Sequence, residues 1–402
     1  MRKHAFLVIV GLLLCAAPLL TAAAKKAEQT VAPAAIRADA SDRNHTAKKL
    51  HSTKSPATTR GSVTETTGDV AVSPAKIHLV WQHDNLPSVD LSTLPKVTGV
   101  NVVSPCWYVI SNEYGRITSK AVEGYTARAR SKGYQVWPLI TNGFDPDRTK
   151  KLLQDHNARR YVINQLLSEA EKHGFQGINL DFENIYQEDK EALTQFVAEI
   201  RKATKKKHLI LSMDVTVPDG SPNWSLCFDR KNLAKQVDYL LLMAYDQYSG
   251  GSPMAGPTAS FNWDEAGVTA TLQEVPADKL VLGLPLYMRL WQFDTKAKRF
   301  RAKTLSMSQA AGIHKEKSTD PTYRCRWLEK EKMLYVSYME QDVPYCFWQE
   351  NAQSLRNKAE LVNRFGLAGI AAWRYGFETP DIWPVLEEVL QQEKAPAPKT
   401  TT

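Results

Sequence analysis

Two carboxylates at alternate positions of one short apolar run are the strongest candidates for chemistry. The run reads Gly177-Ile-Asn-Leu-Asp-Phe-Glu183. Because side chains alternate along a strand, Asn179, Asp181 and Glu183 would share one face. Carboxyl groups this close raise each other's pKa, so that one can stay protonated while its neighbour is ionised. The pattern therefore predicts general acid catalysis.

The alternative is a structural ion pair inside the fold. That alternative requires a cation beside the two acids, and no Lys or Arg lies within the run from Gly177 to Glu183. The composition of the run favours the catalytic interpretation and leaves ion pairing as the alternative.

Two other apolar runs end in residues that could bind a ligand. Tyr245 and Asp246 end the run Leu242-Met-Ala-Tyr-Asp246, and Trp373 ends the run Ala371-Ala-Trp373. A tyrosine here could equally be a core residue, and the indole could be core packing or a platform for a sugar ring. Further aromatic residues expected near the same rim are Trp107, Tyr248, Trp263, Trp291 and Trp348. Aromatic residues around central carboxylates favour a carbohydrate ligand.

Eight apolar runs alternate with helical patterns and must position these residues. The expected strands are Ile77–Trp81, Val100–Val103, Gln135–Ile140, Gly177–Phe182, Leu209–Val217, Tyr239–Ala244, Leu280–Leu284 and Ala368–Trp373. Helical spacing is clearest at Arg159–His173 and Lys190–Thr204. Near-continuous apolar strands separated by helices indicate a parallel sheet. We predict an α/β fold, a (β/α)8 TIM barrel with reactive groups at the carboxyl ends of its strands.

The interval between the last two strands is too long for a plain loop. It runs from about 287 to 366 and contains possible strands at Met333–Met339 and Tyr345–Gln349. We expect a small α+β insertion on the top rim of the barrel, within a catalytic domain spanning 76–392.

The two ends of the chain differ in composition from this domain. Residues 1–24 combine Arg2 and Lys3 with an apolar run and small residues, which predicts a secretory signal peptide, with an uncleaved membrane anchor as the alternative. Residues 25–75 contain no aromatic residue and are rich in Ala, Ser, Thr and Lys, so we expect a disordered linker. We expect a disordered tail at 393–402. The protein is predicted to be secreted or associated with a bacterial cell envelope.

Charge and cysteine content exclude several classes of function. The net charge is +8, but residues 76–402 hold 41 Lys and Arg against 38 Asp and Glu, which gives no argument for nucleic acid. No C-x-x-C motif or His pair has zinc spacing, and no glycine-rich phosphate loop is present, so we predict no metal and no cofactor. Among the cysteines of the main domain, Cys325 and Cys346 are closest in sequence, and at most one disulfide is expected. We expect a monomer with no membrane partner beyond the export signal.

The motifs together resemble those of family 18 glycoside hydrolases, the chitinase superfamily. The run ending at Glu183 is similar to the family signature D-x-x-D-x-D-x-E, and Met243-Ala-Tyr-Asp246, Leu282-Gly-Leu-Pro-Leu-Tyr287 and Trp373 match further landmarks. Four stretches look closer to bacterial spore-cortex and cell-wall N-acetylglucosaminidases: Val102–Trp107, Gly177–Asn184, Tyr248–Ser252 and Gly369–Glu378.

This resemblance implies a retaining mechanism in which the substrate's own N-acetyl oxygen is the nucleophile. Glu183 would be the general acid and then the base, and Asp181 would orient the acetamido group and stabilise the intermediate. Tyr245 would hold the acetamido carbonyl, Asp246 would contact the sugar or the acid, and Trp373 would floor the sugar subsite. Asn179, Trp107 and Tyr248 complete the expected substrate-binding set.

The chain departs from the signature at Gln176 and Asn179, which stand where the pattern has Asp. Asn179 removes a charge beneath Asp181, so we expect a more acidic lower limb of the pH profile than Asp would give.

Three functions remain open from the sequence. The first is hydrolysis of β-linked N-acetylglucosamine in peptidoglycan, the second is hydrolysis of chitin or chitooligosaccharides, and the third is a catalytically silent lectin. Family members of the lectin type usually lose the terminal acid, and Glu183 is present.

Overall fold

The computed structural model describes residues 75–392. The predicted signal peptide, nearly all of the predicted linker and the predicted tail lie outside this range.

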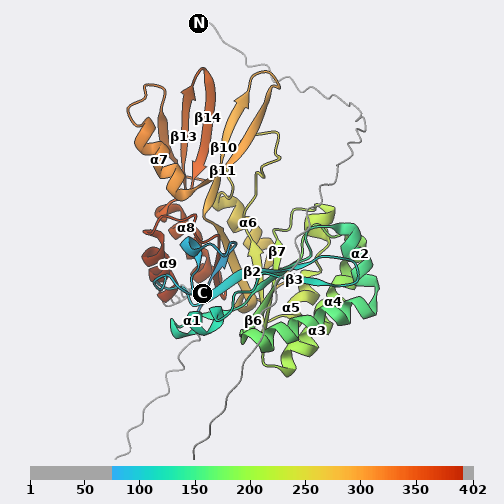
Figure 1. The fold of residues 1–402 in the computed structure, drawn as a ribbon. Coiled ribbons are helices and arrows are strands. Elements are labelled where there is room, and N and C mark those ends of the chain that lie inside the picture. The colour runs from blue at the N-terminus through green and yellow to red at the C-terminus, as the bar shows by residue number, and fades with distance from the viewer. Residues whose placement is uncertain (1–74, 393–402) are drawn as a thin grey trace, which may run out of the picture. The chain divides into compact units, whose positions relative to one another are not determined.

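Eight parallel strands close into a barrel (Figure 1). The barrel positions are occupied by β1 (Ile77–Gln82), β2 (Val102–Ile110), β4 with β5 (Gln135–Val136, Leu139–Thr141), β6 (Gly177–Asp181), β7 (Ile210–Thr216), β8 (Tyr239–Met243), β9 (Leu280–Pro285) and β15 (Gly369–Trp373). Closure is complete because β1 pairs in parallel with both β2 and β15. The predicted (β/α)8 barrel is confirmed.

Two barrel strands differ from their predicted ranges by more than a one-residue shift of an end. The second strand continues to Ile110, where it pairs antiparallel with β3 (Ile117–Ser119). The third is divided at Trp137 and Pro138 into β4 and β5. Proline has no N–H to donate to a neighbouring strand, although the Pro138 carbonyl still accepts from Asn179 N at 3.0 Å.

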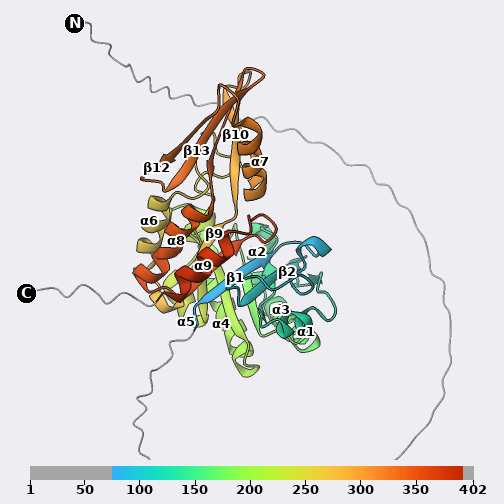
Figure 2. The same cartoon turned by 90° about the vertical axis from the view of Figure 1, so that its left-hand side faces the viewer.

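Helices follow the strands around the outside of the barrel. They are α1 (Tyr125–Ser131), α2 (Pro146–Gln154), α3 (His156–His173), α4 (Lys190–Lys206), α5 (Arg230–Gln236), α6 (Phe261–Thr271), α8 (Ala352–Phe365) and α9 (Ile382–Gln391). Single turns lie at Pro87–Val89, Gln187–Asp189, Pro222–Leu226 and Ala277–Lys279. Figure 2 shows α8 and α9 side by side along the strands. None of the helices in residues 75–392 combines the length and apolarity that a membrane crossing requires.

Apolar side chains form two layers, one inside the barrel and one between strands and helices. The inner cluster is Ile77, Leu79, Trp81, Val102, Trp137, Leu139, Leu241, Val281 and Ala371, with Trp373 packed against it. Alternate residues of the same strands face outward into the larger cluster, as Val80 and Val103 do. The inner layer fills the barrel below its carboxyl-terminal rim, so a ligand can enter only from the rim.

The predicted insertion between the last two strands is confirmed. Its five-stranded antiparallel sheet has the order β11-β10-β14-β13-β12. The bounds are β10 (Tyr287–Asp294), β11 (Arg299–Ser306), β12 (Arg324–Leu328), β13 (Met333–Glu340) and β14 (Val343–Gln349), with helix α7 at Met307–Lys317. Two strands begin near their predicted positions, and the first hairpin and α7 were not foreseen.

Cys325 and Cys346, the pair closest in sequence, do not form a disulfide. Cys325 pairs with Val336 and Cys346 pairs with Ser337, which are adjacent residues of β13. Adjacent residues of a strand point to opposite faces, so the two thiols lie on opposite sides of the sheet. All four cysteines between residues 75 and 392 are free thiols.

Candidate functional site

Buried polar side chains meet at the centre of the barrel, where the sequence placed its acids. Asn179 is fully buried, and its Oδ1 accepts from Trp81 Nε1 at 2.9 Å while its Nδ2 donates to Asp214 Oδ1 at 2.7 Å. These partners belong to β1 and β7, so Asn179 points into the barrel. Asp181 follows it two residues later at the end of β6 and is 7% exposed.

A third acid, Asp214 on β7, belongs to this group and was missed in the sequence. It is 1% exposed. The signal that could have found it is the alternation of Ser212 and Asp214 within an otherwise apolar strand, since both would face inward with polar side chains. The central group of the site therefore contains Asp214 besides Asp181 and Glu183.

All three carboxyl groups have a pKa above the ordinary value. Burial is the main cause for each. The charge of Asp214 further raises the pKa of Asp181, and the charge of Asp181 further raises the pKa of Glu183. No Lys or Arg within residues 75–392 forms an ion pair with any of the three. The alternative of a structural ion pair is therefore wrong.

Asn142 fixes the main chain of Glu183. Its Oδ1 accepts from Glu183 N at 3.1 Å, and its Nδ2 donates to Glu183 O at 2.8 Å. The amide is itself held by Thr149 Oγ1 at 2.9 Å, and Asn142 is 1% exposed. This residue follows β5, and sequence reasoning missed it because a single Asn after a strand is also a common turn residue.

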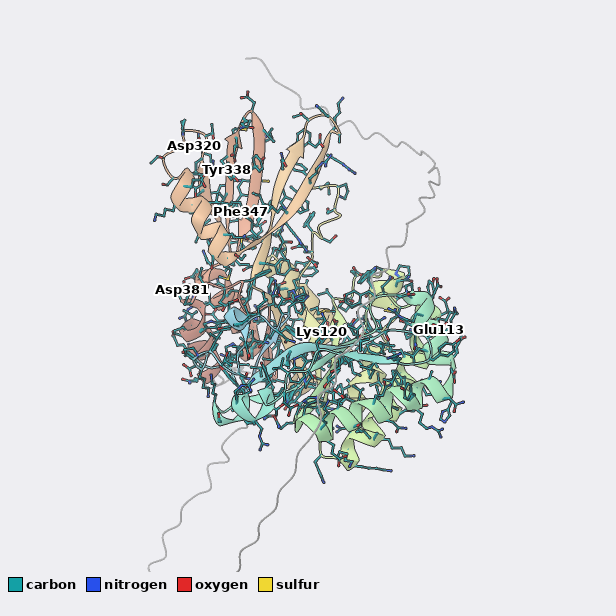
Figure 3. All side chains as sticks on the ribbon, viewed as in Figure 1. Glu113, Lys120, Asp320, Tyr338, Phe347 and Asp381 are labelled. Atoms are coloured by element: carbon teal, nitrogen blue, oxygen red, sulfur yellow. The ribbon has the colours of Figure 1, made fainter. Side chains whose placement is uncertain are left out.

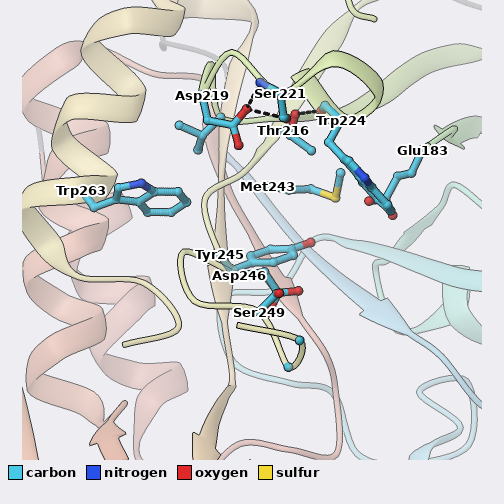
Figure 4. A pocket seen from close by; sticks show the side chains of 13 residues that line it. Glu183, Thr216, Asp219, Ser221, Trp224, Met243, Tyr245, Asp246, Ser249 and Trp263 are labelled. Atoms are coloured by element: carbon cyan, nitrogen blue, oxygen red, sulfur yellow. Dashed lines mark hydrogen bonds between the residues drawn. The ribbon is translucent and has the colours of Figure 1, made fainter. Parts of the chain in front are cut away.

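A pocket of about 560 Å³ adjoins this group and is lined by Glu183, whereas Asp181 and Asp214 are not among its lining residues. Figure 4 shows Glu183 on one side and Trp263 on the other, with Tyr245 and Asp246 beneath and the Thr216–Trp224 segment above. Its walls come from the ends of β6, β7 and β8 and from α6. Aromatic walls with carboxylates at the base suit a sugar ring, which has apolar faces and a polar edge.

Asp246 connects the barrel to the insertion. It has a left-handed backbone (φ 61°), and its Oδ1 accepts from Arg289 Nη2 at 2.7 Å. Arg289 is a residue of β10, and its guanidinium lies 5.0 Å from the Tyr287 ring centroid. Its Nε is buried without a hydrogen-bond partner in the described range. The insertion thus supplies a cation at the edge of the pocket, which the sequence did not reveal.

Replacing this cation should weaken ligand binding more than it slows turnover. Arg289→Lys keeps the charge but loses the planar fork that reaches Asp246. We expect KM to rise about tenfold, which corresponds to the free energy of one charge-assisted hydrogen bond. The change in kcat should be about twofold or less. Steady-state kinetics on an N-acetylglucosamine oligomer would measure both. Arg301→Lys, in an exposed ion pair with Asp294, is the matched control, and an equal rise in KM there would contradict the prediction.

Tyr245 and Trp373 lie at the rim, as predicted. Tyr245 lines the pocket and packs edge-on against Tyr287, with ring centroids 6.2 Å apart. Trp373 is half-buried and packs edge-on against Trp81 at 5.8 Å. It therefore lies on the uppermost apolar layer of the barrel, in contact with Trp81, whose indole N–H donates to Asn179.

Trp107 and Asn179 were expected to contact substrate, but the structure buries both side chains completely. Trp107 is fully buried and packs against Tyr125 of α1, with ring centroids 5.1 Å apart. Its neighbour Cys106 packs against the inner cluster, so alternation turns the indole outward to the helices. The Asn179 side chain is completely buried and forms hydrogen bonds with Asp214 and Trp81.

Tyr248 is not among the residues that line the pocket. Its ring rests on Gly256, where an added Cβ would lie 2.3 Å from Tyr248 Cδ2. The carbonyl of Gly256 accepts from Trp291 Nε1 at 2.8 Å. Tyr248 thus packs within the loop that covers Trp291, and the adjacent Ser249 and Gly250 line the pocket in its place.

The hydrogen bond from Asn179 to Asp214 has a consequence for the pH profile. This bond lowers the pKa of Asp214, opposing the effect of burial. Asn179→Asp would remove the donor and add a like charge, so the pKa values of Asp214 and Asp181 should rise. The acidic limb of kcat/KM against pH should then move to higher pH. An unchanged limb, or an equal shift in the exposed control Asn164→Asp, would contradict this.

Across residues 75–392, no three or more His, Cys, Asp and Glu side chains are grouped so as to hold a metal ion.

The chain is similar in sequence to known proteins. The model of glycosyl hydrolases family 18 matches residues 106–378. The chain is 25% identical over 286 residues to the glycosylase YvbX of Bacillus subtilis, covering 68% of this chain and 80% of the relative. It is 26% identical over 287 residues to the cortical fragment-lytic enzyme of the same organism, covering 68% of this chain and 64% of the relative.

Solved structures share the fold. The spore cortex-lytic enzyme SleL of Bacillus megaterium superposes with a TM-score of 0.69 at 20% identity, covering 81% of this chain and 77% of that one. A chitinase of Chromobacterium violaceum gives a TM-score of 0.69 at 22% identity, covering 79% of this chain and all of that one. Because the family model spans most of the barrel and the insertion, the chain belongs to glycosyl hydrolases family 18 and is a glycoside hydrolase.

Proposed function

We propose that this protein is an exported hydrolase that cleaves β-linked N-acetylglucosamine in peptidoglycan by substrate-assisted retaining catalysis. The observation that carries the proposal is the arrangement of Glu183 at the pocket wall above buried Asp181, with no cation paired to either acid within the described range. Export is supported by the pattern of residues 1–24.

Glu183 acts as the general acid on the leaving oxygen. Burial and the charge of Asp181 raise its pKa, so Glu183 keeps its proton to higher pH than an ordinary glutamate and has it available for transfer. Asn142 forms hydrogen bonds with both the main-chain N–H and the main-chain carbonyl of Glu183. These bonds limit where the carboxyl group can move. After the sugar bond breaks, the same carboxylate accepts a proton from the attacking water.

Asp181 orients the acetamido group of the substrate. Its Oδ1 is buried and has no hydrogen-bond partner among residues 75–392. An unpaired buried acceptor is costly, and an acetamido N–H entering from the pocket would satisfy it. The charge then stabilises the positive intermediate formed when the acetamido oxygen attacks the anomeric carbon. Tyr245, at the pocket floor, holds the acetamido carbonyl.

The peptidoglycan substrate is supported by relatives rather than by the pocket alone. Cortical fragment-lytic enzymes of Bacillus subtilis, Bacillus anthracis and Bacillus cereus match this chain at 26–27% identity. The chain spans only 58–64% of their lengths, so their activity comes to this chain as a proposal.

Products identify the substrate directly. The protein would be incubated separately with purified peptidoglycan and with chitin oligomers, with Glu183→Gln as the blank, and the soluble products read by mass spectrometry. Muropeptides ending in reducing N-acetylglucosamine are expected from peptidoglycan. Products from chitin alone would replace the proposal with a chitinase, and no product from either polymer would overturn the hydrolytic assignment of this site.

A further inference from the structure

The insertion contains a second pocket, distinct from the one above the acids. It encloses about 300 Å³ and is lined mainly by aromatic and small polar side chains, among them Phe293, Phe300, Tyr335, Ser337, Pro344 and Tyr345. None of its ten lining residues is charged. Strands β10 and β14 pair at only two positions, and the pocket opens beyond them, where the two hairpins separate (Figure 1).

The two faces of the insertion sheet differ in what covers them. Helix α7 packs on one face, where His314 lies 6.3 Å from the Phe347 ring and Lys317 lies over Tyr338 (Figure 3). Alternation on β10 places Phe293 on the other face, together with Arg289, which contacts Asp246 of the catalytic site. Phe293 at the second pocket and Arg289 beside the catalytic pocket therefore share one face of β10, about 13 Å apart along the strand. Tyr338 and Tyr345 line the second pocket from the α7 side of the sheet.

Two exposed guanidinium groups border the second pocket. Arg326 pairs with Tyr335 and Arg324 pairs with Ser337, so their side chains share the face of these pocket residues. The Arg326 guanidinium lies 5.6 Å from the Tyr335 ring centroid. Neither arginine forms an ion pair with an acid in the described part of the chain.

Charge is distributed unevenly between barrel and insertion. Residues 287–349 hold 12 Lys and Arg against 7 Asp and Glu, whereas the other residues of 75–392 hold 27 against 30. The excess of positive charge within the described domain thus belongs to the insertion. Arg324 Nη1 donates to the Pro321 and Tyr323 carbonyls at 2.7 and 2.8 Å, but neither guanidinium has an acidic partner in the described range. An uncharged aromatic pocket bordered by such guanidinium groups favours a ligand that joins apolar groups to carboxylates.

We propose that this second pocket binds the carboxylate-bearing peptide stems of peptidoglycan, an inference that rests on the proposed function. Free carboxylates of a stem would pair with Arg324 and Arg326, and its small apolar side chains would enter the aromatic pocket. Neutral chitin has no carboxylate with which these arginines could form an ion pair. The pocket therefore selects stem-bearing glycan over bare glycan, and it does so outside the catalytic acids.

Binding to purified walls tests the proposal. Full-length Glu183→Gln protein would be cosedimented with peptidoglycan freed of phosphate polymers, either with its stems or after an amidase has removed them. We expect about tenfold tighter binding to the stem-bearing form, the value of one or two charge-assisted hydrogen bonds. Adding Arg324→Gln and Arg326→Gln should abolish that difference and leave binding to stripped glycan unchanged.

The opposite sheet face provides the matched control. Arg299 and Lys303 on β11 are exposed and point away from Phe300, so Arg299→Gln with Lys303→Gln removes the same charge. This control should keep the stem preference within about twofold. An equal loss in both double variants, equal binding to both wall forms, or binding that requires phosphate polymers would overturn the proposal.

Failure of the second binding site can be distinguished from failure of the proposed hydrolysis. With Glu183 restored, both double variants should cleave stem-free N-acetylglucosamine oligomers at the unchanged rate, because neither pair of residues lines the catalytic pocket. Cleavage of peptidoglycan without any stem preference would overturn only the second site. Failure to cleave peptidoglycan at all, despite stem-dependent binding, would overturn only the proposed reaction.

Discussion

Glu183→Gln is expected to lower kcat by about 10³-fold while the affinity for an N-acetylglucosamine oligomer changes little, because the amide keeps the shape of the acid but has no proton to transfer. The side chain lines the pocket, and its main chain is fixed by Asn142, so the substitution should leave the pocket in place. Turnover would be measured by product release, and affinity by calorimetry on the inactive variant.

A nearby acid outside the pocket supplies the control. Glu188 is exposed and pairs with Lys150 at 3.1 Å. Glu188→Gln makes the same substitution in the same connection between β6 and α4 and should keep kcat within about twofold. If Glu183→Gln retained most of its turnover, the general acid would be another group. If it lost affinity and turnover together, Glu183 would contribute to binding rather than to proton transfer.

The fold could be predicted because its main signal is local. Each barrel strand is buried on both faces and therefore appears in the sequence as a short apolar run. A local pattern does not show where a strand is interrupted or where it continues beyond its apolar run. Pro138 divides a strand whose apolar run is unbroken, and β2 extends to Ile110 because β3 is available to pair with it.

The candidate site was predicted only where its residues follow the apolar runs of barrel strands, as Glu183 and Tyr245 do. Asp181 and Glu183 share a motif, so their proximity follows from alternation alone. Asp214 reaches Asn179 from β7 and Arg289 reaches Asp246 from the insertion, and no spacing in the sequence shows that these elements meet. Trp107 was placed wrongly because an aromatic residue near a strand end can face either the rim or the helices, and one residue of register decides which.

The group of buried acids lowers the stability of the folded protein. Three carboxyl groups with a raised pKa and no ion-paired cation in the described domain cost stability whenever they ionise. The fold offsets this cost only partly, through the Asn179 amide on Asp214. Such a cluster is retained where its titration is used, and that links the structure of the barrel centre to acid catalysis.

Asp181→Asn is the sharpest test of how these acids divide their roles. Removing the charge should lower kcat by about 10²-fold, because the positive intermediate loses its stabilising carboxylate. It should also lower the pKa of Glu183, since the neighbouring charge of Asp181 is one of the causes that raise it. Glu183 would then lose its proton at lower pH, and the alkaline limb of kcat/KM against pH should move to lower pH.

Stability separates this catalytic loss from misfolding. A carboxyl group whose pKa is raised on folding costs stability above its unfolded pKa, where it would otherwise be ionised. Asp181→Asn should therefore be at least as stable as the parent protein at pH 7, measured by urea unfolding. The exposed control Asp147→Asn, which loses only a bond from the Tyr186 hydroxyl, should leave kcat and the alkaline limb in place. A less stable Asp181→Asn protein with an unmoved alkaline limb would show that Asp181 supports the barrel and does not tune Glu183.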